Sequence, residues 1–214
     1  MRASQSDLAD VIVRSANSDA RLVAAFRTVP RAGFVPPQLA ELAYEDRPLP
    51  IAHGQVTTQP SLSAQMIDAL ELTPDSRVLE VGTGLGFQTA LLATLAARVT
   101  SIERWPDLAE QARTHLARHG ITNVEVRIGD GSLGVPDAAP FDAILVSAAY
   151  PEVPRSLVAQ LRERSRLVQP IGEGGNDAVT LFRKEADQLR RVRVVVPARF
   201  VRLIGDEAFP DDSR

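Results

Sequence analysis

Hydrophobic positions at the start of the chain recur every three or four residues, which is the spacing of an amphipathic helix. Leu22, Phe26 and Val29 show this spacing after the candidate caps Ser18 and Asp19. Such spacing places apolar side chains on one helical face, so the pattern predicts helices that pack against a core. The helices predicted in this first part span 5–16, 18–29 and 60–71.

A proline-rich segment separates the second and third of these helices. Residues 29–51 contain five prolines. Each proline removes a backbone donor and clashes with the preceding turn of a helix, so the segment cannot form one long helix. We expect it to wrap over the domain, with one short helix near 37–43.

From residue 77 onward, short apolar runs alternate with helical patterns. The runs predict buried strands and the intervening spacing predicts helices. Strands that alternate with helices favour a parallel sheet with helices on both faces. The predicted strands are 77–82, 98–103, 124–130, 141–148 and 166–172, and the predicted helices are 86–96, 106–119 and 154–163.

Two further strand-like runs, 177–183 and 190–205, end the pattern and bring the sheet to seven strands. The six residues between them are too few for a crossover helix, so this pair is expected to be antiparallel. We therefore predict an α/β fold with a doubly wound, Rossmann-like, mostly parallel seven-stranded sheet, an antiparallel C-terminal strand pair and an N-terminal helical extension. The tail after residue 205 is expected to fray.

Composition excludes several kinds of chemistry. Lysine and arginine number 24 against 27 acidic residues, so the bulk charge of -3 gives no reason to expect a nucleic-acid or membrane partner. The absence of cysteine excludes disulfides, thiolate zinc sites and a cysteine nucleophile. The sequence shows neither a signal-peptide pattern nor a long apolar span, so we expect a cytoplasmic protein.

The strongest chemical signal is a glycine-rich turn between a predicted strand and a predicted helix. Gly82, Gly84 and Gly86 alternate there, and such a turn brings backbone and helix amides close to a ligand. The spacing differs from the G-x-G-x-x-G pattern of dinucleotide sites, and Glu80 lies two residues before the first glycine. A carboxylate repels a pyrophosphate, so this pattern favours a positively charged amino-acid cofactor.

Acidic residues mark the ends of three predicted strands. Glu103 ends the second strand, where an acid can bind a ribose diol. Asp130 ends the third strand and is followed by Gly131, and Asp142 lies at the start of the fourth. One strand-end acid often only caps the next helix, but three of them beside a glycine turn predict a cofactor crevice.

These segments resemble class I S-adenosylmethionine-dependent methyltransferases and, more narrowly, the protein-L-isoaspartate O-methyltransferase family. The broader resemblance rests on EVGTGLGF, on Glu103 and on Gly129-Asp130-Gly131. The narrower one rests on VPRAGFVP (29–36), AYEDRPLPI (43–51) and the HGQ and QP of residues 53–60. Similarity spans about residues 25 to 205.

The resemblance implies methyl transfer from S-adenosylmethionine to the free carboxylate of isoaspartyl residues in damaged proteins. The product would be S-adenosylhomocysteine, and no metal is expected. A carboxylate with a pKa near 4 is ionised at neutral pH and needs no general base, while the cofactor brings an activated methyl group. The protein must then mainly align the two groups. The implied partners are isoaspartyl proteins or peptides, and we expect a monomer.

The same resemblance assigns the site residues within one methyltransferase domain, 1–214. Residues 1–60 would form the wrapping extension that contributes to the substrate site, and residues 61–214 the cofactor-binding core. Thr58 is the candidate catalytic residue. The implied cofactor-binding residues are Glu80, Gly82, Thr83, Gly84, Gly86, Glu103, Arg104, Asp130 and Gly131. The implied substrate-binding residues are His53, Gln55, Thr57, Thr58, Ser147 and Ala148.

Two positions in 53–60 depart from the family pattern G-Q-T-hydrophobic-S-Q-P. Val56 stands where threonine is usual, and Thr58 replaces the usual serine. Thr58 keeps a hydroxyl donor for a carboxylate but adds a methyl group. Two alternatives therefore stay open beside the isoaspartyl enzyme. One is a carboxyl methyltransferase for another peptide or small molecule, and the other is a cofactor-binding protein without catalysis.

Other polar and aromatic residues have ordinary interpretations. His115 and His119 share a predicted helix face with no apparent third ligand, so we expect a solvated face and not a metal site. Trp105 either covers the adenine or has a packing role. The arginines of the last predicted strand are expected to form a solvated face; they are Arg190, Arg191 and Arg193.

Overall fold

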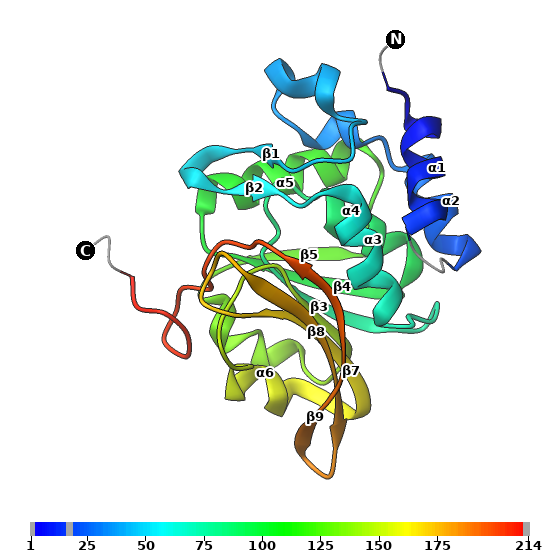
Figure 1. The fold of residues 1–214 in the computed structure, drawn as a ribbon. Coiled ribbons are helices and arrows are strands. Elements are labelled where there is room, and N and C mark those ends of the chain that lie inside the picture. Colours follow the sequence, from blue (N-terminus) through cyan, green and yellow to red (C-terminus); the bar gives the residue numbers. More distant parts are fainter. Residues whose placement is uncertain (1–2, 16–18, 212–214) are drawn as a thin grey trace.

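The computed structural model describes residues 3–15 and 19–211, and a seven-stranded sheet forms its centre (Figure 1). The strands are β3 (Arg77–Val81), β4 (Arg98–Glu103), β5 (Val124–Ile128), β6 (Phe141–Val146), β7 (Leu161–Ile171), β8 (Asp177–Glu185) and β9 (Gln188–Ala198). Their order in the sheet is β5-β4-β3-β6-β7-β8-β9. The first five run parallel, and β8 is antiparallel to both β7 and β9. The predicted fold class is confirmed.

The order of the strands creates a crevice at the carboxyl edge of the sheet. The chain moves outward from β3 through β4 to β5 and then returns to β6 on the other side of β3. Loops on the two sides of β3 therefore run in opposite directions. Ligands of open α/β sheets bind at such a switch point, which here lies directly after Val81.

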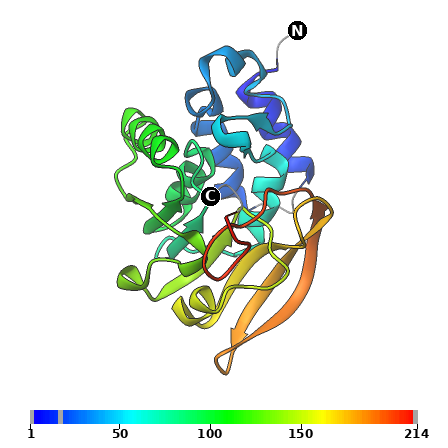
Figure 2. The ribbon, with the colours of Figure 1, turned by 90° about the vertical axis from the view of Figure 1, so that its left-hand side faces the viewer.

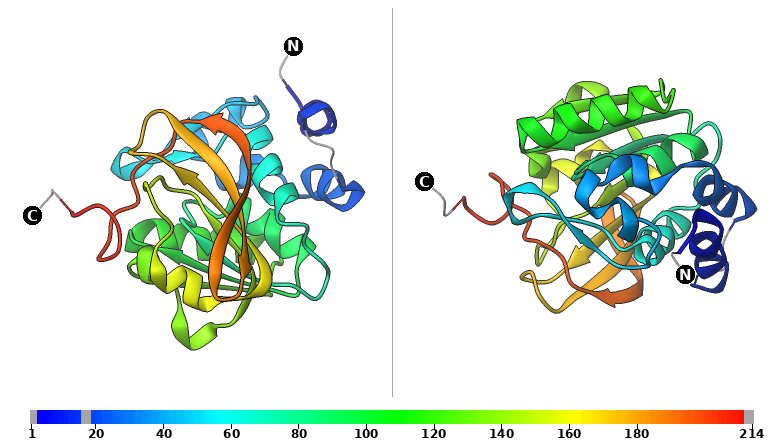
Figure 3. Two further views of the ribbon diagram at one scale, coloured as in Figure 1. Left: turned by 60° about the horizontal axis from the view of Figure 1, so that its bottom comes forward. Right: turned by 90° about the horizontal axis from the view of Figure 1, so that it is seen from above.

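Helices cover the two faces of this sheet unequally. The helices are α1 (Gln5–Ser15), α2 (Ala20–Thr28), α3 (Pro60–Ala69), α4 (Phe87–Leu95), α5 (Pro106–Arg118) and α6 (Arg155–Gln160). Apolar side chains of α1 to α5 form one core cluster with one face of the sheet. The other face packs against α6, the short segment near Val135 and the C-terminal residue Leu203. Figures 1 and 3 show α1 and α2 at the end of the molecule opposite to the C-terminal segment.

The N-terminal helices lie where the hydrophobic spacing predicts them. Asp19 caps α2 by accepting a hydrogen bond from the backbone N–H of Arg21. The other candidate cap, Ser18, lies outside the described residues. The predicted short helix near 37–43 is a 3-10 helix, η2 (Pro37–Leu42), which follows another, η1 (Arg31–Phe34).

A two-stranded hairpin within the wrapping segment was not predicted. It consists of β1 (Leu49–Pro50) and β2 (Val56–Thr57), joined through the 3-10 turn η3 (Ala52–Gly54). At its tip both His53 and Gly54 have positive φ, 59° and 65°, and such residues typically make tight turns. We call residues 49–57 the arm.

The boundary between α6 and β7 differs from the prediction. The predicted helix 154–163 ends at Gln160, and β7 begins at Leu161 instead of residue 166. The side-chain amine of Lys184, on β8, donates to the carbonyls of Val158 and Leu161 at 3.1 and 2.9 Å. This contact satisfies carbonyls at the helix end, and no local pattern announces it because Lys184 is distant in sequence.

The C-terminal part also differs from the prediction. The last strand ends at Ala198 and not at residue 205, and the chain then crosses to pair with residues that follow β6. Residues 206–211, expected to fray, are tied down instead. The backbone N–H of Asp206 donates to Asp130 at 2.7 Å, and Arg104 pairs with Asp211 at 2.8 Å. Residues 212–214 lie outside the described part. The arginines of β9 are exposed, as predicted.

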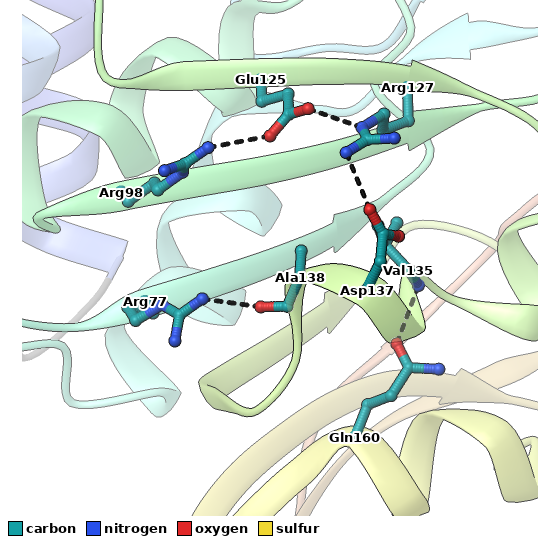
Figure 4. A network of polar contacts seen from close by, with 8 residues as sticks. All are labelled: Arg77, Arg98, Glu125, Arg127, Val135, Asp137, Ala138 and Gln160. Atoms are coloured by element: carbon teal, nitrogen blue, oxygen red, sulfur yellow. Dashed lines mark hydrogen bonds and ion pairs between the residues drawn. The ribbon is translucent and has the colours of Figure 1, made fainter.

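Polar contacts from β3 and β5 reach the short 3-10 helix η5 (Pro136–Ala138) (Figure 4). Glu125 bridges Arg98 and Arg127, and Arg127 also pairs with Asp137 at 3.0 Å. Asp142 stabilises the sheet near the start of β3, where it accepts from the backbone N–H of Arg77 at 2.8 Å. It is therefore at the edge opposite to the glycine turn, and its expected place in the cofactor crevice was wrong.

Candidate active site

A cavity of about 930 Å³, including the part open to solvent, lies at the carboxyl edge of the sheet. Its lining comes from the glycine turn, the end of β4 and the residues after β6. The arm and the C-terminal segment, residues 199–211, complete it. Both covering segments lie on the side of Figure 1 that faces the viewer in Figure 2. The predicted site residues that line the cavity are Gln55, Thr57, Thr58, Gly82, Thr83, Gly84, Glu103, Arg104, Gly131, Ser147 and Ala148.

The glycine turn depends on backbone conformations that other residues rarely adopt. Gly82, Gly84 and Gly86 all have positive φ, at 96°, 55° and 93°, where a side chain is disfavoured. A Cβ at Gly82 would already lie 3.4 Å from the Cβ of Ser147. The turn therefore offers bare backbone to the cavity. Gly86 does not line the cavity, and it forms the N-cap of α4.

Glu80 lies beneath the glycine turn and not on the cavity surface. It is fully buried, and its carboxylate accepts hydrogen bonds from Gln88, Thr89 and Ser101. Burial raises the pKa of Glu80 to about 7, although these hydrogen bonds act in the opposite direction. Glu80 thus joins β3 to α4 and β4 through hydrogen bonds. The sequence had suggested that it contacts the cofactor directly.

Glu103 reaches the cavity from the end of β4. Its carboxylate accepts from the backbone N–H of Gly84 at 2.9 Å and from that of Trp105 at 3.1 Å. Burial raises its pKa, while these two donors and Arg104 lower it. An ionised carboxylate has about four acceptor positions, so two remain for a ligand with paired hydroxyl groups.

The tip of the arm closes on the start of α5. The imidazole of His53 stacks on Trp105 with ring centres 3.9 Å apart and planes within 3°. Its Nε2 lies 2.8 Å from Asp107 Oδ1. His53 does not line the cavity. Its contacts with Trp105 and Asp107 attach the arm to the start of α5. The indole Nε1 of Trp105 is buried and has no hydrogen-bond partner among the described residues.

Thr57 and Thr58 differ in what their hydroxyl groups do. The Thr57 oxygen accepts from Arg31 at 2.9 Å and from the backbone N–H of Leu49 at 3.2 Å, so it serves the arm. No hydrogen bond of the Thr58 hydroxyl is found within residues 3–15 and 19–211. Thr58 and Ser147 line both this cavity and a neighbouring groove. That makes Thr58 the better candidate for a substrate contact.

The C-terminal segment closes the far side of the cavity, near the end of β5. Leu203 and Ile204 line the cavity there. Asp130 does not line it; its two oxygens accept from Ser132 and from the backbone N–H of Asp206. No sequence motif predicts this closure, because the pattern of residues 201–205 indicates a continuation of the last strand.

Comparison with known proteins identifies the family. The family model for protein-L-isoaspartate (D-aspartate) O-methyltransferase matches residues 3–208. A protein-L-isoaspartate O-methyltransferase of Methanoculleus marisnigri is 52% identical over 78% of this chain and 76% of its own length. One of Myxococcus xanthus is 46% identical over 92% of this chain and 94% of its own length. The chain belongs to the protein-L-isoaspartate O-methyltransferase family.

Solved structures agree with this family assignment. A protein-L-isoaspartate O-methyltransferase structure aligns with a TM-score of 0.84 at 28% identity, over 96% of this chain and 67% of the other. A candidate family member from Plasmodium falciparum, in complex with S-adenosyl-L-homocysteine, shares the fold with a TM-score of 0.78 at 24% identity, over 95% and 99%. The chain is therefore an S-adenosylmethionine-dependent carboxyl methyltransferase.

The cavity of this methyltransferase fits that cofactor. The bare glycine backbone suits close approach of the amino-acid part, and Glu103 retains acceptor positions for ribose hydroxyls. Trp105 also lines this cavity, and its buried Nε1 has no hydrogen-bond partner within residues 3–15 and 19–211.

The two histidines of α5 have a packing role in this methyltransferase. His119 stacks on Phe34 with ring centres 4.7 Å apart, and the His115 ring meets Phe34 edge-on at 5.9 Å. Both are half-buried, so the expected solvated face was wrong.

No group of three metal-ligating side chains occurs within the described residues. In the same part of the chain, no helix has the length and apolar character that a membrane span requires.

Proposed function

We propose that this enzyme methylates the free carboxylate of L-isoaspartyl residues in damaged proteins, as the names of its relatives indicate for them. One observation carries the proposal: the cofactor cavity and the neighbouring groove share Val56, Thr58, Ser147 and Val201. A polypeptide that lies in the groove presents its carboxylate at this junction.

The groove suits a polypeptide better than a small acid. It encloses about 780 Å³, including open solvent, between the arm, the start of α3 and residues 196–201. Its walls combine apolar side chains such as Leu62 and Phe200 with polar ones such as Gln59 and Ser61. Protein interfaces combine apolar and polar contacts, so these walls are compatible with a peptide segment.

Different residues around the cavity are proposed to bind different parts of the cofactor. When bound, S-adenosylmethionine supplies a methyl group on a positively charged sulfur. In the proposal, Gly82, Thr83 and Gly84 hold its amino-acid part, and Glu103 accepts hydrogen bonds from its ribose hydroxyls. Arg104 and Gly131 border the adenine side, and Asp130 acts through the C-terminal segment.

The residues shared by the cavity and the groove are proposed to align the substrate. The Thr58 hydroxyl donates a hydrogen bond to one oxygen of the acceptor carboxylate, while the other oxygen faces the methyl group. Ser147 and Ala148 border the same point. The carboxylate is ionised at neutral pH, so no general base is required, and alignment supplies most of the rate.

A broader acceptor range is the second candidate, because Val56 changes the surface of the junction. Its side chain is 46% exposed and lines both cavities, at a position where the family usually has threonine. The proposal also treats residues 1–60 and 61–214 as parts of one domain that acts as a monomer in the cytoplasm.

Radiolabelled methyl transfer to a synthetic isoaspartyl peptide, with its aspartyl twin as control, tests the proposal. We expect base-labile methyl esters on the isoaspartyl peptide only. Esters on both peptides would favour the broader carboxyl methyltransferase. Cofactor binding without ester on either peptide would refute the proposed substrate.

A further inference from the structure

We propose that Arg31 and Asp46 are positioning residues for methyl transfer, because they fix the backbone that carries Thr58. The inference rests on the proposed role of Thr58 at the junction of the two cavities. Neither residue lines the cavity or the groove, and the proposed function assigns no role to either.

Arg31 is a buried cation whose hydrogen-bond acceptors lie in two stretches of chain, residues 43–47 and residues 57–58. Its side chain is 0% exposed. The guanidinium donates to backbone carbonyls and to one hydroxyl: Ala43 O (3.0 Å), Glu45 O (3.0 Å), Arg47 O (2.9 Å), Thr57 Oγ1 (2.9 Å) and Thr58 O (3.4 Å). No ion pair of Arg31 occurs among the described residues. Asp46 acts on the buried cation electrostatically and raises its pKa, against the larger effect of burial. Burying a charged group is costly unless it is paired and hydrogen-bonded, so simple space filling does not explain an arginine here.

The shape of the guanidinium explains the choice of residue. Arginine presents five N–H donors in a planar fork, whereas lysine is a point charge. The fork at Arg31 joins the carbonyls of residues 43–47 to residues 57 and 58 on the other side. Burial lowers the pKa of Arg31 to about 10, so the group stays charged at neutral pH. The cation therefore ties two separate stretches together.

Asp46 holds the next residues of the same segment. Its Oδ1 accepts from the backbone N–H of Ser61 at 2.8 Å, and its Oδ2 accepts from the Gln59 side chain at 3.0 Å. Asp46 belongs to the stretch that Arg31 grips. The chain from residue 57 to residue 61 is thus held on one side by a cation and on the other by a carboxylate.

This arrangement matters because secondary structure does not hold Thr58. The strand β2 ends at Thr57 and the helix α3 begins at Pro60, so Thr58 and Gln59 belong to neither. Displacing a substrate-aligning group by about 1 Å can lower a rate by about 100-fold. Two side chains that fix both ends of this short linker therefore set the position of the Thr58 hydroxyl.

The test compares Arg31→Met and Asp46→Asn with Arg47→Met as a matched control. Arg47 lies in the same stretch, but among the described residues its exposed side chain pairs only with Glu45, at 3.5 Å. We expect Arg31→Met to lower kcat on the isoaspartyl peptide about 10- to 100-fold, with S-adenosylmethionine affinity changed less than about threefold. Asp46→Asn should act in the same direction, and the control should keep wild-type kcat.

A double-mutant cycle separates positioning from general support of the fold. If Arg31 acts through Thr58, then Arg31→Met should cost little further kcat in a Thr58→Val background. Arg31→Lys should restore little, because one ammonium group cannot reach both stretches. Multiplicative losses in the double mutant, or unchanged kcat in both Arg31→Met and Asp46→Asn, would overturn the inference.

Folding is checked independently by the melting temperature and by cofactor binding. If Arg31→Met does not fold, Asp46→Asn and its double mutant with Thr58→Val decide the question by the same comparison. Failure of the wild-type protein to methylate the isoaspartyl peptide would instead refute the proposed function. A wild type that methylates, beside variants that lose nothing, refutes only the positioning role.

Discussion

Glu80 and Glu103 are two acidic residues that the sequence places beside the same glycine turn, and the structure gives them different tasks. Both are buried. Glu80 is saturated by side-chain donors beneath the turn, while Glu103 meets backbone donors and borders the cavity. Sequence spacing shows that an acid is near a ligand site. It does not show on which side of the turn the carboxylate points, because that depends on the strand face.

The raised pKa of Glu80 makes stability depend on pH. Below about pH 4.5 the group is protonated in both states. Between its ordinary value of 4.5 and its folded value of about 7, the unfolded chain releases a proton that the folded protein retains, so stability falls as pH rises through this window. Above pH 7 the loss is complete, at most about 3 kcal/mol.

Glu80→Gln should remove this dependence, because the amide does not ionise. We expect the free energy of unfolding of the variant, relative to wild type, to rise between pH 5 and pH 8. Urea unfolding at four pH values measures it, with the exposed Glu110→Gln as control. Parallel curves for wild type and Glu80→Gln would contradict the assignment.

At the scale of elements, the sequence pattern predicted the helices and strands whose bounds depend on residues close in sequence. The strands β3 to β6 and the helices α4 and α5 follow hydrophobic period and proline or glycine signals close in sequence. The end of α6 instead depends on Lys184, and the path after Ala198 depends on pairing with Ala149. Such boundaries are set by partners distant in sequence, which single-sequence patterns do not contain.

The tip of the arm contacts the start of α5 through His53. His53 stacks on Trp105 and reaches Asp107, so the arm is fastened across the mouth of the cavity. An aromatic pair contributes about 0.5–1.5 kcal/mol beyond its buried area. Removing it should speed the opening of the arm.

His53→Ala should therefore raise the rate of S-adenosylhomocysteine release about two- to tenfold, following the energy of the ring pair. Trp105 is the only tryptophan of the chain, so stopped-flow fluorescence reports this region directly. His53→Phe keeps the stacking and should stay closer to wild type. A release rate that is unchanged in His53→Ala would show that the tip does not limit release.

At the scale of the whole molecule, two parts that are far apart in sequence close one site. The arm covers the cavity from the N-terminal side, and residues 201–204 cover it from the C-terminal side. The sequence predicted the first closure through its family motifs. It did not predict the second, because the contacts of Asp130 with Asp206 and of Arg104 with Asp211 join residues without a recognisable pattern.

The close approach of Gly205 to the end of β5 provides a test of the second closure. A Cβ at Gly205 would clash with Asp130 Oδ1 and Ser132 Oγ. Gly205→Ala must therefore displace the C-terminal segment or rotate these two side chains, which accept hydrogen bonds from the backbone N–H groups of residues 206 and 207. Overpacking of this kind costs about 1–3 kcal/mol. Leu203 and Ile204 would move with the segment and open the adenine side of the cavity.

We therefore expect Gly205→Ala to weaken S-adenosylmethionine binding about fivefold or more, in line with that cost, and to speed tryptic cleavage after Arg202. The matched control is Gly129→Ala, whose Cβ would make an ordinary contact at 3.5 Å with Ile102. Calorimetry and limited proteolysis measure the two effects. Faster cleavage with unchanged affinity would mean that the C-terminal segment covers the cavity without contributing to cofactor binding, because the glycine turn and Glu103 would then suffice.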